Sequence, residues 1–143
     1  MKSNVKKVSK ASRENNEPYL QELDRQLGAY FSNRLKKFDL KALGISSDLG
    51  ELEGTELQRK VWKELLAVPF GQTITYLELA KRVEKPKAVR AVANAVGANP
   101  LHILIPCHRI VPSSPKTKGD LGGYAGGIEV KRFLLSFEGV QIS

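Results

Sequence analysis

Residues 76–99 read YLELAKRVEKPKAVRAVANAVGAN and predict two short helices joined by a tight turn. The spacing of the apolar residues favours a first helix over residues 76–83, with three residues turned inward: Leu77, Leu79 and Ala80. A second helix is expected to start at Pro86, which suits a first turn, and to run as far as Gly97 and Asn99. The small and basic residues of this second helix complete a helix-turn-helix pattern, which is typical of DNA-binding domains.

The segment upstream predicts a longer helix with a defined start. Thr55 is a good N-cap, and Gln58 stands three residues on, where it completes a capping box. The apolar stripe that follows stops near Pro69 and consists of Leu57, Val61, Trp62, Leu65 and Leu66. A short β-branched piece, residues 73–75, then leads into the helix-turn-helix.

Positive charge gathers at the turn between the two short helices. The chain of 143 residues carries 23 basic and 15 acidic side chains, a formal charge of +8. Residues 81–90 hold one acid, Glu84, against five bases: Lys81, Arg82, Lys85, Lys87 and Arg90. Such a cluster indicates attraction to a polyanion, either nucleic acid or an anionic membrane surface. An ordinary solvated helix face would carry the same residue types.

The sequence contains one cysteine, Cys107, which excludes an internal disulfide and a cluster of thiolates around zinc. An apolar run, residues 101–106, precedes it and is expected to form a buried strand or turn. His108 and Arg109 follow at once, and this electropositive setting predicts a thiolate nucleophile with His108 as its base or relay. The alternative is a small hydrophobic residue buried in an apolar run.

The N-terminal part of the chain divides differently. Residues 1–18 are expected to be a flexible basic arm, and apolar spacings of three and four predict a helix over residues 19–31. A short extended segment is expected around residues 35–40, followed by a connector over residues 41–54. No apolar run approaches the length of a membrane span and no signal peptide begins the chain, so we expect a soluble intracellular protein.

Segment 106–110, PCHRI, resembles the active-site motif of the O6-alkylguanine-DNA alkyltransferases, also called methylated-DNA–protein-cysteine methyltransferases. Further matching motifs cover nearly everything from residue 54 to residue 139: 54–55, 58–62, 69–73, Tyr76 with 79–80, 86–92, 99–100, 123–127, Lys131 with 134–135, and 138–139. The resemblance implies an α/β fold, mostly α, with a C-terminal winged-helix-like helix-turn-helix domain that carries the cysteine. The expected division is a shortened N-terminal domain with its connector, residues 19–53, and a DNA-binding and alkyltransferase domain, residues 54–143.

The resemblance also assigns roles in catalysis. Cys107 matches the alkyl acceptor, and His108 matches the residue that deprotonates it through a bound water. Glu138 matches the carboxylate that orients the imidazole, and Tyr76 matches the phenol that donates a hydrogen bond to the guanine ring. No cofactor and no metal are implied, and the protein is expected to react once and stop.

Other residues match the family's DNA and base contacts. Arg90 matches the arginine that occupies the space left by a flipped base, on a helix that the family places in the minor groove. Asn99 matches the residue that bridges the helix-turn-helix to the active-site turn. The remaining expected contacts are the pocket loop, Tyr124 and Ala125, and the DNA-facing positions Lys87, Ala88 and Ala91. Ala93 stands where the family often has glycine.

The implied function is direct-reversal DNA repair by irreversible transfer of the alkyl group from O6-alkylguanine in double-stranded DNA to Cys107. The expected protein is a prokaryotic, cytoplasmic, DNA-associated monomer with no membrane contact. The alternative is a non-catalytic alkylguanine-binding protein of the alkyltransferase-like type, which usually has tryptophan at the cysteine position. A transcription regulator that uses the helix-turn-helix alone would leave Tyr76, Glu138 and the PCHR segment unexplained.

Overall fold

The computed structural model describes residues 17–117 and 119–142 and divides the chain into two compact units, one ending at Glu51 and the other starting at Leu52. The expected basic arm therefore lies, apart from its last two residues, outside the described residues. We retain residues 19–53 and 54–143 as the proposed domains. Among the described helices, none combines the length and the apolar character that crossing a membrane requires.

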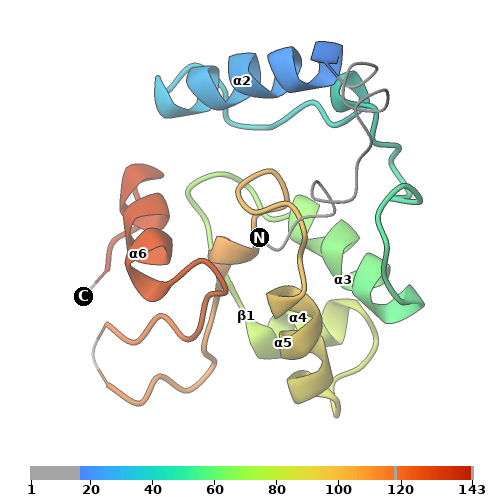
Figure 1. The fold of residues 1–143 in the computed structure, drawn as a ribbon. Helices are drawn as coiled ribbons and strands as arrows, with labels where there is room; N and C mark the ends of the chain where they lie inside the picture. Colours follow the sequence, from blue (N-terminus) through green and yellow to red (C-terminus); the bar gives the residue numbers. More distant parts are fainter. Residues whose placement is uncertain (1–16, 118, 143) are drawn as a thin grey trace. The chain divides into compact units, whose positions relative to one another are not determined.

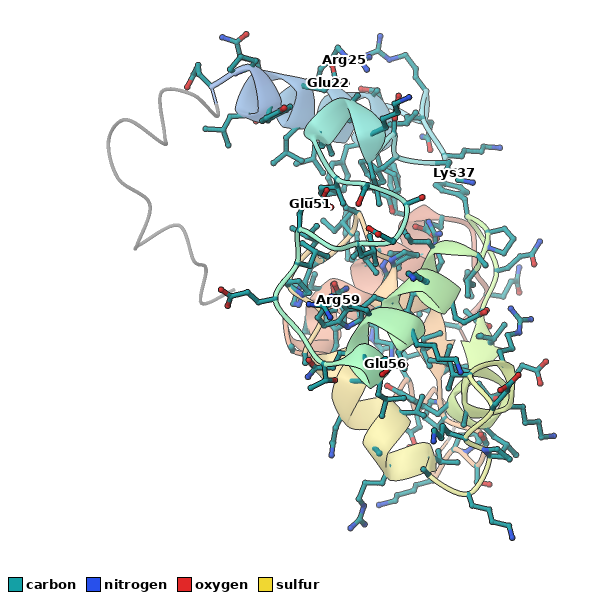
Figure 2. All side chains as sticks on the ribbon, turned by 90° about the vertical axis from the view of Figure 1, so that its right-hand side faces the viewer. Glu22, Arg25, Lys37, Glu51, Glu56 and Arg59 are labelled. Carbon is teal, nitrogen blue, oxygen red and sulfur yellow. The ribbon has the colours of Figure 1, made fainter. Side chains whose placement is uncertain are left out.

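The first unit consists of helix α2 (Glu17–Phe31), a series of turns and the short 3-10 helix η2 (Lys41–Leu43) (Figure 1). The buried side chain of Gln26 joins the helix to the following segment, because its amide donates to the Asp39 carbonyl at 3.0 Å and accepts from the Asp39 N–H at 2.8 Å. On the outer surface Glu22 pairs with Arg25 at 2.6 Å (Figure 2). The predicted extended segment does not form a strand: residues 35–40 are irregular chain with bends, and the backbone at Asp39 is bonded to a side chain of α2 rather than to a strand.

The second unit holds four helices, a single 3-10 turn and two short strands in its described part. In chain order they are α3 (Glu56–Leu66), β1 (Ile74–Thr75), α4 (Tyr76–Arg82), α5 (Val89–Gly97), η3 (Cys107–Arg109), β2 (Ile110–Val111) and α6 (Ile128–Phe137). The strands pair in parallel, Ile74 with Ile110 and Thr75 with Val111. Figure 1 shows η3 and the strands between α6 and the group formed by α3, α4 and α5. The predicted fold class, mostly α with a small β component, is confirmed.

Helix α3 begins as the sequence predicts and anchors α5. The Thr55 hydroxyl accepts from the Gln58 N–H at 3.1 Å, and the Gln58 side chain accepts from the Thr55 N–H at 2.8 Å, so the capping box is complete. Trp62, 1% exposed, donates its indole N–H to the Ala95 carbonyl at 2.9 Å. This bond fixes helix α5 against α3 in the core of the unit.

Two details of the helix-turn-helix differ from the prediction. Helix α5 starts at Val89, three residues after Pro86, because the chain turns through a left-handed residue, Glu84 at φ 61°, and a further bond from the Ala88 N–H to the Lys85 carbonyl. Leu77 is 36% exposed rather than inward-facing. It stands two residues before buried Leu79, about 200° away around a helix, and therefore on the opposite side.

Removal of the Thr55 hydroxyl tests this account of α3. We expect Thr55→Ala to lower the free energy of unfolding by about 1 kcal/mol, because the N–H of Gln58 loses its partner, while Thr55→Ser keeps the cap and stays close to the parent. Urea titration followed by Trp62 fluorescence measures it, since Trp62 is the one tryptophan of the sequence. Equal loss in both variants would contradict the cap.

Candidate active site

The turn that presents Cys107 is held by Asn99. Residues 101–106 form a turn rather than a strand, with Ile103 at φ 76°. Asn99, 3% exposed, donates its amide to the Ile105 carbonyl at 2.7 Å and accepts from the Leu101 N–H at 3.0 Å. Both polar ends of this side chain are thus used inside the protein, and they connect the end of the helix-turn-helix to the cysteine.

Behind Cys107 lies a buried carboxylate, Glu138, with hydrogen-bond donors on both oxygens. Its Oε2 contacts His108 Nε2 at 2.8 Å and accepts from Arg109 Nη2 at 2.8 Å. Its Oε1 accepts from Arg109 Nε at 2.8 Å and from the Gly71 N–H at 3.2 Å. A third Arg109 nitrogen donates to the Val68 carbonyl at 2.8 Å, so the guanidinium braces the carboxylate and the chain beside it.

Gly71 allows the approach of the chain to Glu138. Its φ is +80°, and a Cβ placed there would lie 3.0 Å from the Glu138 carbonyl oxygen. A larger residue would therefore meet both backbone strain and a close contact. The glycine of the PFGQ segment is required by this geometry.

The tautomer of His108 follows from its neighbour. Because Glu138 accepts from Arg109 and Gly71, it acts as an acceptor toward His108 as well, and Nε2 carries the proton. Nδ1 then holds a lone pair, and it is buried with no hydrogen-bond partner within the described residues. Burial, partly opposed by Glu138, lowers the pKa of His108, so the imidazole is neutral at pH 7 and can take a proton at Nδ1.

The resting state of Cys107 differs from the sequence-based expectation. Burial raises the pKa of the thiol, opposed in part by Asn99, Lys131 and Tyr124, so the neutral thiol predominates at rest rather than a thiolate. The guanidinium of Arg109 does not supply the expected positive field, because its nitrogens are directed to Glu138 and the Val68 carbonyl. The thiolate has to be formed by transfer of the proton.

Lys131 is a functional candidate to which sequence reasoning assigned no role. It is 0% exposed, and its Nζ donates to the Ile110 carbonyl at 2.6 Å and to the Gly123 carbonyl at 3.2 Å. Burial lowers its pKa to about 8, which leaves an ammonium at pH 7 whose charge favours the Cys107 thiolate. The sequence carries one sign of its burial: Lys131 stands three residues before Leu134 and four before Leu135, which places it on the apolar face of a helix.

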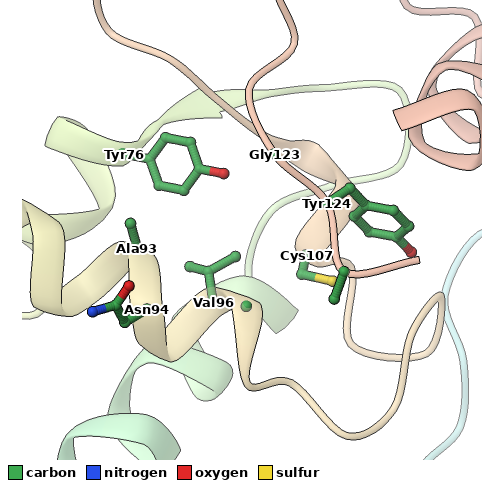
Figure 3. A pocket seen from close by; sticks show the side chains of 9 residues that line it. Tyr76, Ala93, Asn94, Val96, Cys107, Gly123 and Tyr124 are labelled. Carbon is green, nitrogen blue, oxygen red and sulfur yellow. The ribbon is translucent and has the colours of Figure 1, made fainter. Parts of the chain in front are cut away.

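A pocket of about 440 Å³ opens onto Cys107 (Figure 3). Its lining comes from α4, α5, η3 and the glycine-rich loop of residues 122–127: Tyr76, Ala93, Asn94, Val96, Gly97, Cys107, Gly123, Tyr124 and Ala125. Figure 3 shows the Tyr76 hydroxyl directed into the pocket from one side and Tyr124 on the other, beside Cys107. The pocket thus brings together Cys107, Tyr76, Tyr124 and Ala125, and it adds Asn94, which sequence reasoning did not single out.

Tyr124 is packed closely within its loop. Its ring lies 5.2 Å from that of His102, and a Cβ on Gly126 would come within 2.8 Å of it. Burial raises the pKa of Tyr124, and the nearby Cys107 acts in the same direction, so the phenol keeps its proton. Glycine at position 126 therefore leaves the space that the Tyr124 ring occupies beside the pocket.

The residues expected to face DNA at the start of α5 are not among those that line the pocket. Lys87, Arg90 and Ala91 are exposed and Ala88 is half-buried. The other bases of the turn are exposed too, and Arg82 pairs with Glu78 at 3.7 Å while Glu84 pairs with Lys60 at 3.9 Å. Across residues 17–117 and 119–142 no three His, Cys, Asp or Glu side chains are placed to hold a metal ion.

These features define a class of protein: a helix-turn-helix unit whose second helix borders a pocket containing a cysteine, with a buried histidine and carboxylate behind it.

Comparison with known proteins assigns the chain to a family with these features. Residues 56–140 match the family model described as 6-O-methylguanine DNA methyltransferase, DNA binding domain. The methylated-DNA–protein-cysteine methyltransferase of Methanosarcina acetivorans is 45% identical over 124 residues, 87% of this chain and 72% of that protein. That of Methanosarcina barkeri is 46% identical over 123 residues, 86% and 70%.

Among solved structures, Mycobacterium tuberculosis OGT in complex with DNA matches with a TM-score of 0.70 and 42% identity, over 82% of this chain. The chain spans 65% of the length of that protein. The chain therefore belongs to the family of methylated-DNA–protein-cysteine methyltransferases. It is a DNA-binding methyltransferase of direct-reversal DNA repair.

The buried ammonium of Lys131 gives a testable pH dependence. We expect Lys131→Met to raise the pKa of Cys107 further, because the thiolate loses a nearby positive charge, and to slow alkylation by iodoacetamide at pH 7 by about tenfold for each pKa unit. The measurement is the alkylation rate of the single cysteine across roughly pH 6 to pH 10. Lys131→Arg, which keeps the charge, should restore much of the profile, and identical profiles for both variants and the parent would refute the electrostatic role.

Proposed function

We propose that Cys107 removes the alkyl group from O6 of guanine in DNA and keeps it, so that each molecule acts once. The observation that carries this proposal is a pocket lined by Cys107, with His108 directly after it in the chain and hydrogen-bonded to Glu138 in a buried pair. The sequence offers no second thiol to remove the resulting thioether.

The proposed reaction moves one alkyl group and one proton. The thiol proton of Cys107 passes to His108 Nδ1 through a water molecule, and the sulfur then attacks the alkyl carbon. The bond from that carbon to O6 breaks, and its electron pair returns to the guanine ring. The guanine ring gains one proton, and the proton that His108 took from the thiol balances it, so the products are an S-alkyl cysteine, unmodified guanine and a neutral His108.

Two groups of the pocket would assist the leaving guanine. The phenol of Tyr76 points into the pocket, and burial together with Cys107 raises its pKa, so that it remains a proton donor. A hydrogen bond from Tyr76 to the ring nitrogen would stabilise the negative charge that develops as the bond to O6 breaks. Tyr124 and Ala125 would form one side of the base-binding pocket, with a backbone N–H of this loop facing O6.

We also propose that double-stranded DNA lies along the exposed side of α5, with this helix in the minor groove and the lesion rotated into the pocket. The pocket opens beside α5, and exposed Lys87 and Arg90 stand at the start of that helix. Small residues, Ala88 and Ala91, permit close approach of the helix to the groove. Arg90 would occupy the space that the rotated base leaves.

The remaining proposals concern the state of the protein. We propose a monomer that works in the cytoplasm of a prokaryote, in association with DNA and without a bound cofactor. The non-catalytic, alkylguanine-binding alternative is disfavoured because a cysteine occupies the acceptor position and the bonded pair of His108 and Glu138 stands beside it.

Replacement of the sulfur separates transfer from binding. We expect Cys107→Ser to abolish transfer of a labelled methyl group from an O6-methylguanine oligonucleotide, because a hydroxyl is far harder to ionise than a thiol, and to retain binding to the lesion. Mass spectrometry of the protein and gel-shift titration measure the two properties. Parent protein that binds the oligonucleotide without gaining methyl mass would favour the non-catalytic alternative.

A charge on α5 tests the proposed rotation of the base. We expect Arg90→Ala to slow repair of the duplex by about tenfold while changing the reaction with free O6-alkylguanine base by less than about twofold, because the free base needs no rotation. Arg132→Ala, which removes one exposed positive charge from α6, is the matched control and should leave the ratio of the two rates unchanged. Equal losses on both substrates in Arg90→Ala would exclude the role in rotation.

A further inference from the structure

Asn94 stands at the mouth of the pocket, and neither catalysis nor folding accounts for it. It is exposed on α5 and lines the pocket together with Cys107 (Figure 3). Its carboxamide makes no hydrogen bond with any described residue. Asn99, five residues on, shows the contrast, because both polar ends of that side chain are bonded within the protein.

The position of Asn94 along α5 is fixed relative to Arg90. Residues four apart lie on one helix face, with their Cβ atoms about 5–6 Å apart. If Arg90 occupies the place of the rotated base, Asn94 lies about one to two base-pair steps along the groove, since successive base pairs rise about 3.4 Å. Exposed Ala91, Gly97 and Ala98 around it have little or no side chain, so they leave the carboxamide free to reach a base edge.

The chemistry of the minor groove selects what a carboxamide can recognise there. Every base pair presents acceptors at purine N3 and pyrimidine O2, and a G·C pair adds the guanine 2-amino donor. A carboxamide matches a G·C pair better than an A·T pair, because its oxygen can accept from the 2-amino group while its nitrogen donates to a neighbouring acceptor.

We propose that Asn94 is a specificity-determining residue that reads the minor-groove edge of the base pair beside the lesion and favours repair next to G·C. This inference rests on the proposed function, because it takes the placement of α5 in the minor groove from it. It goes beyond that function in assigning a preference for sequence context to one side chain of this chain.

The test uses duplexes in which the guanine flanking O6-methylguanine, on either side, is replaced by inosine, which lacks only the 2-amino group. We expect inosine at one flank to slow repair by the parent protein about threefold to tenfold, the range for loss of one hydrogen bond. In Asn94→Ala the two duplexes should react at equal rates, both near the rate of the parent on the inosine duplex.

Two further variants separate recognition from packing and from general affinity. Asn94→Leu keeps the size of the side chain without its polar atoms and should be insensitive to inosine as well. Lys87→Ala removes an exposed charge, so it should weaken binding to all duplexes alike and reduce the salt dependence, while the inosine effect remains.

The outcomes distinguish this inference from the proposed function. If the parent does not react with any lesion duplex, the proposed function fails. If the parent reacts but inosine has no effect at either flank, or if Asn94→Ala keeps the full inosine effect, the reading role of Asn94 is refuted. An equal loss of rate in Asn94→Ala on free O6-alkylguanine base and on duplex would place the contact on the lesion itself and would also overturn the inference.

Discussion

The buried carboxylate of Glu138 is the group on which the arrangement of the site depends. It joins the turn after α3, through the Gly71 N–H, to the 3-10 turn that carries Cys107, through His108 and Arg109. A carboxylate in such a place is stable only with donors on its oxygens, and removal of one partner from a buried pair costs about 3–5 kcal/mol. The bonds that satisfy the buried Glu138 oxygens also set the tautomer of His108. The same contacts therefore stabilise the fold and prepare His108 to accept a proton.

The opposing effects on Cys107 decide how the nucleophile behaves. Burial favours the thiol, whereas Asn99, Lys131 and Tyr124 favour the anion, and burial has the larger effect. The lowered pKa of His108 likewise keeps the imidazole neutral, so the resting pair carries no charge. Charge separation is then confined to the moment at which a proton moves from sulfur to Nδ1.

The sequence predicted those parts of the structure that depend on local residues. The capping box at Thr55 and the helix predicted over 76–83 follow from neighbouring residues; the box is present, and the helix forms over Tyr76–Arg82. The start of α5 was misplaced because Pro86 fits a helical first turn as well as the turn actually formed, and only the left-handed Glu84 distinguishes them. The state of Cys107 was misjudged because Arg109 follows it in sequence but is directed to Glu138, which lies 29 residues away.

The roles of Lys131 and Asn94 likewise depend on contacts between residues far apart in the sequence, so the sequence alone does not reveal them. Lys131 acts on Cys107 only because the fold brings α6 close to the thiol. Asn94 becomes a candidate for binding only because a pocket opens beside it. Filling that pocket with a base would displace water, which strengthens the attraction between the Lys131 ammonium and a forming thiolate. The same loss of water also removes hydration from the anion, so the Lys131 charge offsets only part of the cost of ionisation, and the reaction still depends on transfer of the thiol proton to His108.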